Sequence, residues 1–266
     1  MSQFYKPHRN PNWNYGGERW RLSRSKIDLF VSCPRCFYID NKLGTARPPG
    51  FPFNLNSAVD ALLKKEFDIH RARGSKHPLM ETYGVDAVPF KHEDMNIWRD
   101  PFKGVTYFHK QTGFMVSGGV DDVWVTPEDE LIVVDYKATS KDETPTLDAE
   151  WQDGYKRQME IYQWLLRANG FKVSSTGYFV YANGKKDAAA FDAKLEFEVV
   201  LLPYTGSDDW VEKVLRGIKA CLDGGELPQG GDQCDFCIYR EAVEEVTKKQ
   251  KKESVEKKGQ AKGLFG

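Results

Sequence analysis

The chain has 266 residues, which is enough for one large domain or two small ones with a sizeable core. Its hydrophobic content of 40% and aromatic content of 13% exclude a disordered protein. The net charge of -1 excludes a global basic field for nucleic acid, so any such contact needs local patches. The polar N-terminus is unlike a signal peptide and no apolar run is long enough to span a membrane, so we expect a cytoplasmic protein.

The first segment, residues 1–22, is predicted to be an irregular arm. Basic and aromatic side chains interleave in it and just beyond it: Lys6, His8, Arg9, Trp13, Tyr15, Arg19, Trp20, Arg21, Arg24 and Lys26. Such a mixture can hold a phosphate backbone and stack on bases. The alternative is an arm packed on the protein surface, which we favour for Trp13 and Trp20.

Helical and strand patterns follow in a mixed order. Ser23 or Ser25 can cap a helix that Pro34 ends, and consecutive prolines predict a loop at Ala46–Phe53. Apolar residues at helical spacing predict a helix over Asn54–Arg73. Three strands are predicted over 105–109, 114–125 and 130–138, then a helix over 151–171, strands over 176–184 and 195–204, and a helix over 207–225. We therefore expect a mixed α/β domain over 23–245 and a lysine-rich, disordered tail over 246–266.

Two acids and a lysine interrupt the apolar strands. Side chains two apart on a strand share a face, so Asp135 and Lys137 point the same way. If the chain turns at Pro127–Asp129, Asp121 comes near Asp135, and two close carboxylates repel unless a proton or cation lies between them. Mg²⁺ or Mn²⁺ suits such a pair, and Lys137 could hold an attacking water. The pattern indicates metal-assisted phosphodiester hydrolysis. The alternative is a solvated strand face with a Lys–Asp pair.

This set of motifs resembles the PD-(D/E)XK nuclease superfamily, and within it the RecB-type branch that includes CRISPR-associated exonucleases. The matching residues are Gly118 and Asp121 in G-x-V-D, Asp135 and Lys137 in D-Y-K, and Gln158 and Tyr162 in Q-x-x-x-Y. The resemblance covers roughly Ser23 to Arg240. It implies a restriction-endonuclease-like fold with an αβββαβ core and a small central sheet flanked by helices.

The resemblance also implies roles for these residues. Asp121 and Asp135 would bind the metal, Lys137 would be the catalytic lysine, and the backbone carbonyl of Tyr136 would be a further ligand. Gln158 and Tyr162, four apart on a helix, would line the active site or position DNA. The alternative for this last pair is a core tyrosine with a glutamine at the rim.

Asp60 departs from the family pattern, because RecB-type nucleases often carry a histidine at about this place on the first core helix. Aspartate also binds hard cations, so Asp60 is either a third metal ligand or an acid on the polar side of its helix. No histidine lies in a recognisable motif.

Four of the five cysteines form two CxxC pairs, Cys33 with Cys36 and Cys234 with Cys237. This spacing is typical of metal ligands, and one shared site would staple the two ends of the domain. Zinc would fit four thiolates. The resemblance suggests an iron–sulfur cluster instead, although the usual arrangement of one cysteine before the core and three after it is absent. Cys221 is expected to be a small buried hydrophobe.

The sequence therefore predicts a Mg²⁺- or Mn²⁺-dependent DNA nuclease, exo- or endonucleolytic, of the kind used in repair, recombination or phage- and CRISPR-related processing. It would act on single- or double-stranded DNA, possess no membrane segment, and work with protein partners in a repair or defence complex. The alternative is a non-catalytic adaptor that binds nucleic acid or protein through the same fold. A thiol oxidoreductase is disfavoured, because neither CxxC starts a helix after a strand.

Overall fold

The computed structural model describes residues 8–50 and 54–263. The predicted arm, the loop at Ala46–Phe53 and the predicted tail thus reach residues 1–7, 51–53 and 264–266, including Lys6, that lie outside the described residues. The described chain forms two compact units, one of residues 8–20, 29–49 and 220–263 and one of residues 21–28, 50 and 54–219. Among the described residues, no helix is both long and apolar enough to cross a membrane.

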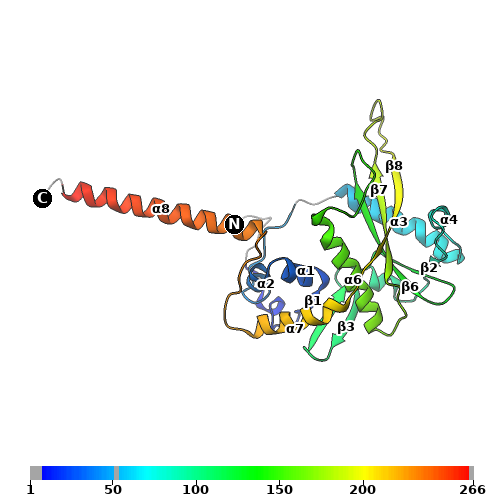
Figure 1. Ribbon diagram of the computed structural model, residues 1–266, viewed down its shortest axis with the longest axis horizontal. Helices are drawn as coiled ribbons and strands as arrows, with labels where there is room; N and C mark the ends of the chain where they lie inside the picture. The colour runs from blue at the N-terminus through cyan, green and yellow to red at the C-terminus, as the bar shows by residue number, and fades with distance from the viewer. Residues whose placement is uncertain (1–7, 51–53, 264–266) are drawn as a thin grey trace. The chain divides into compact units, whose positions relative to one another are not determined.

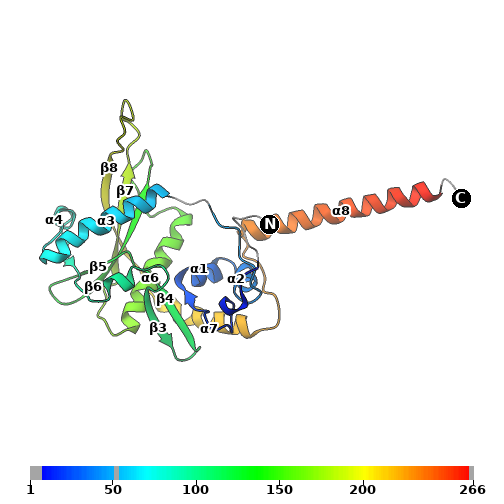
Figure 2. The same ribbon diagram turned by 180° about the vertical axis from the view of Figure 1, so that it is seen from behind.

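The elements are shown in Figures 1 and 2. In chain order they are η1 (Pro11–Trp13), β1 (Leu22–Ser23), α1 (Arg24–Ser32), α2 (Pro34–Asn41), α3 (Asn54–Arg73), α4 (Pro78–Thr82), β2 (Val88–Pro89), α5 (Met95–Trp98), β3 (Val105–His109), β4 (Phe114–Gly118), β5 (Asp122–Val125), β6 (Leu131–Thr139), η2 (Glu150–Gln152), α6 (Asp153–Ala168), β7 (Thr176–Gly184), β8 (Phe197–Thr205), α7 (Asp209–Asp223) and α8 (Asp235–Gly263).

The strands form two sheets in the larger unit. One has the order β1-β4-β3 and the other the order β2-β5-β6-β7-β8. The mixed α/β class is confirmed, because β6 and β7 run parallel while β5–β6 and β7–β8 are antiparallel. The expected single strand over 114–125 is wrong. It divides at Gly119–Asp121 into β4 and β5, which belong to different sheets.

Helices cover both faces of the five-stranded sheet (Figures 1 and 2). On one face, α3 packs Val59, Leu63 and Phe67 against Trp124 and other apolar residues of the sheet, Tyr136 among them. On the other face, α6 lies against the alternate residues of β6, because Gln158 contacts Asp135. Residues that alternate along β6 therefore meet different helices.

The smaller unit holds the arm, α2 and α8. Arg9 forms an ion pair of 2.8 Å with Asp40, and the Trp20 indole donates a hydrogen bond of 3.1 Å to Asn41 Oδ1. These contacts agree with the packed-arm interpretation for Trp20, whereas Trp13 is 49% exposed. The structure also differs from the expected disordered tail, since α8 continues to Gly263. Glu–Lys spacings of four residues, such as Glu244 with Lys248, support this helix over residues 241–252, which are all exposed.

Candidate active site and four-cysteine centre

The two acids of the predicted site lie at neighbouring positions of the β5–β6 pair. The register joins Asp122 to Val134, so Asp121, directly before β5, stands opposite Asp135. The two lie close enough for the charge of Asp121 to raise the pKa of Asp135. This is the arrangement that the turn at Pro127–Asp129 predicts.

Asp135 is fully buried and held from two sides. Gln158 donates a hydrogen bond of 2.6 Å to its Oδ1, and the Lys137 ammonium forms an ion pair with its Oδ2. Burial raises the pKa of Asp135 to about 6, against the lowering effect of Lys137. Oδ2 has the Lys137 ammonium as its partner. A second carboxylate, Asp121, lies close to this buried acid, and two neighbouring carboxylates are the kind of ligands that a hard metal ion takes.

The Lys137 ammonium lies between Asp135 and the ring of Tyr155. It lies 4.4 Å from the centre of the Tyr155 ring, and the Lys137 side chain is 14% exposed. A lysine with so little freedom keeps its charge close to Asp135, where an attacking water or a phosphate oxygen would need it.

Tyr162 is brought to the site by a close approach of α6 to β4. The Gln158 amide donates a second hydrogen bond, of 3.1 Å, to the Tyr162 hydroxyl. The ring packs on Gly118, where a Cβ atom would lie 2.7 Å from Tyr162 Cε1. The glycine of the G-x-V-D string is therefore needed for the tyrosine of Q-x-x-x-Y to fit. Burial raises the pKa of Tyr162 to about 12, so its hydroxyl stays protonated.

Asp60 comes from α3 and meets Asp121 through a lysine that the sequence analysis missed. Lys64 Nζ lies 2.9 Å from Asp60 Oδ2 and 3.2 Å from Asp121 Oδ1. Burial and the charge of Asp121 raise the pKa of Asp60. The spacing of four residues between Asp60 and Lys64 on a predicted helix could have indicated the first of these pairs.

Two further hydrogen bonds hold Asp121 in place, one to its second carboxylate oxygen and one to its backbone carbonyl. The backbone amide of Tyr136 donates a hydrogen bond of 3.0 Å to Asp121 Oδ2, and Arg99 Nε donates one of 3.0 Å to the Asp121 carbonyl. The role of the Tyr136 carbonyl as a metal ligand stays a prediction. A cavity of about 390 Å³ opens beside these groups, with Asn56, Asp60 and Lys137 among its lining residues.

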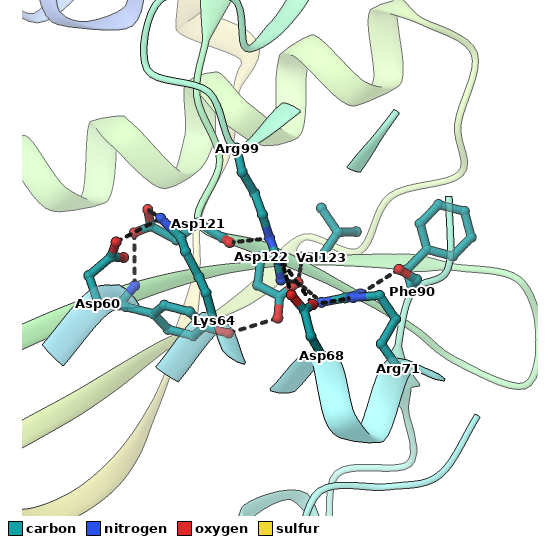
Figure 3. A network of polar contacts seen from close by, with 10 residues as sticks. Asp60, Lys64, Asp68, Arg71, Phe90, Arg99, Asp121, Asp122 and Val123 are labelled. Atoms are coloured by element: carbon teal, nitrogen blue, oxygen red, sulfur yellow. Dashed lines mark hydrogen bonds and ion pairs between the residues drawn. The ribbon is translucent and has the colours of Figure 1, made fainter. Parts of the chain in front are cut away.

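A buried ionic network links the β5–β6 hairpin to α3 and to Arg99 (Figure 3). Asp122 is fully buried and accepts hydrogen bonds of 2.5 Å from Arg71, 3.0 Å from Arg99 and 2.7 Å from the Tyr136 hydroxyl. Asp68 in turn pairs with both arginines at 2.9 Å. The sequence around Asp122 carries no signal for these two arginine partners, which lie 23 and 51 residues away along the chain.

The four predicted cysteines do come together, within the smaller unit. Their ligand atoms all lie within 4.8 Å of one another, and all four side chains are buried. Cys33 and Cys237 are 3.6 Å apart between sulfurs, as are Cys36 and Cys234, while Cys36 and Cys237 are 3.7 Å apart. Among the residues that the structure describes, this is the one group of three or more possible ligands at such spacing. The three acids are therefore not gathered as tightly.

The surroundings treat the four thiols differently: burial raises the pKa of Cys36 and Cys237, whereas Cys33 is stabilised as a thiolate. Although burial alone would raise it, backbone hydrogen bonds from Gly231 and Cys36 lower the pKa of Cys33 to about 6. Arg47 Nη2 donates a hydrogen bond of 3.1 Å to Cys234 Sγ. Cys221 lies outside the group and is a free cysteine of intermediate exposure. The group can hold a metal as thiolates.

Comparison with known proteins agrees with the motifs. No curated protein matches the chain. A solved structure titled "Crystal structure of SSO0001" shares 19% identity and a TM-score of 0.29, covering 48% of this chain and 50% of that one. The match thus spans half the length of that chain, and a TM-score this low adds no support. The model of the PD-(D/E)XK nuclease superfamily matches residues 21–242, which is most of the sequence, and the chain therefore belongs to the PD-(D/E)XK nuclease superfamily.

Proposed function

We propose that the chain is a Mg²⁺- or Mn²⁺-dependent DNA nuclease of RecB type. The observation that carries the proposal is the fully buried Asp135, held by Gln158 and by the Lys137 ammonium, opposite Asp121. Membership of the superfamily supports hydrolysis of phosphodiester bonds.

The metal ligands in this proposal are Asp121 and Asp135, with Asp60 as a third. A divalent cation at this place would neutralise charge on the phosphate and lower the pKa of a bound water. Lys64 now neutralises Asp60 and Asp121, so its ammonium has to move aside when a cation binds.

The chain's own groups carry the remaining tasks. Lys137 holds the attacking water with its ammonium, at the place where Asp135 already fixes that charge. Gln158 keeps Asp135 Oδ1 in position, and Tyr162 supports the Gln158 amide. The water oxygen then bonds to phosphorus as the bond to the leaving oxygen breaks. The water gives up a proton to solvent, and the leaving oxygen takes up a proton from solvent.

Cleavage of labelled single- and double-stranded DNA in Mn²⁺ tests this proposal. Wild-type protein should cut, and Lys137→Ala should lower the rate at least a hundredfold. Lys110→Ala, which changes an exposed lysine outside the site, is the matched control and should cut normally. Equal cleavage by wild type and Lys137→Ala would contradict the assignment.

The alternative function is an adaptor that binds nucleic acid without cutting it. One observation favours it: Lys64 satisfies Asp60 and Asp121 without a metal. DNA binding that is equal in Mn²⁺ and in chelator, with no cleavage by wild type, would establish this alternative.

For the four cysteines we propose a structural zinc ion. Zinc bonded to sulfur at about 2.3 Å in a tetrahedron sets its sulfurs about 3.8 Å apart. The separations of 3.6–3.7 Å are close to that value. Sulfurs that bind separate irons of a four-iron cluster would have to lie farther apart. Metal analysis of anaerobically purified protein should give one zinc and no brown colour, whereas iron with visible absorption would contradict the proposal.

A further inference from the structure

A second polar cavity, separate from the acids, lies in the larger unit. It has a volume of about 250 Å³, and its polar lining is Ser23, Arg24, Ser25, Lys103, Ser117 and Tyr162, without any acidic residue. Two cations and several hydroxyls around one small cavity, with no anion among them, are the chemistry of an anion site.

The two basic side chains are available to a ligand. Within residues 8–50 and 54–263, neither the Arg24 guanidinium nor the Lys103 ammonium has a hydrogen-bonding or ion-pair partner. Lys103 is exposed and Arg24 partly so. Most other arginines of this unit, such as Arg71 and Arg99, form ion pairs with carboxylates.

The hydroxyl of a buried residue in the cavity lining points to the same ligand. Ser117 is 8% exposed, yet its Oγ has no hydrogen-bonding partner within the described part of the chain. It stands beside Ser23, because β1 and β4 pair these two residues in register, and Ser23 Oγ lies 3.0 Å from Ser25 Oγ. A donor held in a lining with no protein partner is suited to a ligand oxygen.

The cavity also lies where a helix begins. Arg24 is the first residue of the nine-residue α1, so the unpaired backbone amides of the first turn and the helix dipole add to the positive potential. These features strengthen the site that the two cations and Ser117 already define.

Tyr162 connects this cavity to the acids. It lines the cavity, and its hydroxyl accepts a hydrogen bond from the same Gln158 amide that holds Asp135. An anion in the cavity is therefore a near neighbour of the scissile phosphate in the proposed reaction.

We infer that this cavity binds a second phosphate group of the nucleic-acid strand, next to the one that is cut. The inference rests on the proposed function, since it places the strand relative to Asp121 and Asp135. The phosphate is either the terminal phosphate of a strand or an internal one of the backbone, and both have the chemistry that Arg24, Lys103 and Ser117 recognise.

Kinetics on labelled single-stranded DNA with a 5′-phosphate, with a 5′-hydroxyl, and in circular form test the inference. Arg24→Gln, Lys103→Gln and Ser117→Ala should each raise KM, Arg24→Gln by about tenfold or more, with a smaller change in kcat. Arg73→Gln and Lys110→Gln remove exposed charges elsewhere and should leave KM unchanged. Thermal unfolding confirms that each variant is folded.

The substrates distinguish the two sources of phosphate. If the phosphate is terminal, wild type prefers the 5′-phosphorylated strand and Arg24→Gln loses that preference. If it is internal, wild type cuts all three DNAs and Arg24→Gln raises KM equally for each. Unchanged KM in all three variants would overturn the inference while leaving the nuclease assignment intact.

Binding provides the same test without catalysis. Fluorescence anisotropy in chelator should show weaker binding of the labelled strand to Arg24→Gln than to wild type and Arg73→Gln, and inorganic phosphate should compete with the strand in wild type. If wild type fails to cut DNA, the proposed function fails, and these measurements still decide the cavity. Equal affinity of all variants would refute it.

Discussion

Gly118→Ala tests the packing that brings Tyr162 to the site. The added Cβ would lie 2.7 Å from Tyr162 Cε1 and 3.0 Å from Leu165 Cδ1. Tyr162 is 3% exposed and its hydroxyl is held by Gln158, so the ring has little room to move away. Strain therefore has to be taken up by a shift of α6 against β4.

The expected cost follows from these contacts. Overpacking of this kind costs about 1–3 kcal/mol, while replacing glycine within a strand returns up to about 1 kcal/mol of backbone entropy. The net loss should be about 1–2 kcal/mol, a decrease in Tm of about 2–8 °C for a domain of this size. Because the shift also moves the Gln158 amide, kcat for DNA cleavage should fall as well.

A double-mutant cycle with Tyr162→Ala isolates the clash. In that background the cost of Gly118→Ala should fall by about 1 kcal/mol, because the ring is gone and only the contact of 3.0 Å with Leu165 Cδ1 remains. Gly154→Ala is the matched control: Gly154 lies in α6, where a Cβ would come no closer than 3.8 Å to any atom, and alanine should be neutral or slightly stabilising. Thermal and urea unfolding measure all of these. An equal cost of Gly118→Ala with and without the Tyr162 ring would refute the reasoning.

Three further predictions concern the charged groups and the cysteines. The pKa of Asp135 is raised from 3.8 to about 6 on folding, so the wild-type protein loses folding stability as the pH rises through that range. In chelator, the free energy of unfolding of Asp135→Asn should therefore rise relative to that of wild type by about 3 kcal/mol between pH 4 and pH 7. A pH-independent difference between the two in urea unfolding would contradict this. Asp122→Asn should lower the free energy of unfolding by about 3–5 kcal/mol, because two buried arginines lose the fully buried one of their two charged partners and keep only the more exposed Asp68. A loss below about 1 kcal/mol would show that the network is not coupled to folding. Cys234→Ala should abolish the bound metal, whereas Cys221→Ala should retain it; metal analysis that gives equal content in both would rule out the four-cysteine centre.

The sequence predicted best where periodicity and spacing determine structure. The helix at Asn54–Arg73 has the predicted bounds, since its apolar residues keep one face over five turns and a proline-rich loop precedes it. The pairing of Asp121 with Asp135 follows from the turn between them. The two CxxC pairs were predicted to meet because their spacing is typical of metal ligands, and the structure brings them together.

The sequence predicted least where partners are remote. Nothing in the pattern around Asp122 indicates that Arg71 and Arg99 converge on it, because a buried acid and an exposed one look alike in sequence. The division of residues 114–125 between two sheets was missed for a similar reason. The two glycines at 118 and 119 permit a close approach that depends on Tyr162 and on the Asp100 carbonyl, both distant in sequence.

The bonds of Asp121 decide which of its partners a metal can replace. Its carbonyl is held by Arg99, and its Oδ2 by the Tyr136 amide, a group that stays in place as long as β6 does. Oδ1 is bonded to Lys64, whose four-carbon stem can move without breaking the sheet, whereas Arg99 is held in place by Asp68 and Asp122. The fold therefore fixes the acid through two of its oxygens, and under the proposed function the third would be the one that a cation binds. Lys64 would then compensate that oxygen in the absence of the cation.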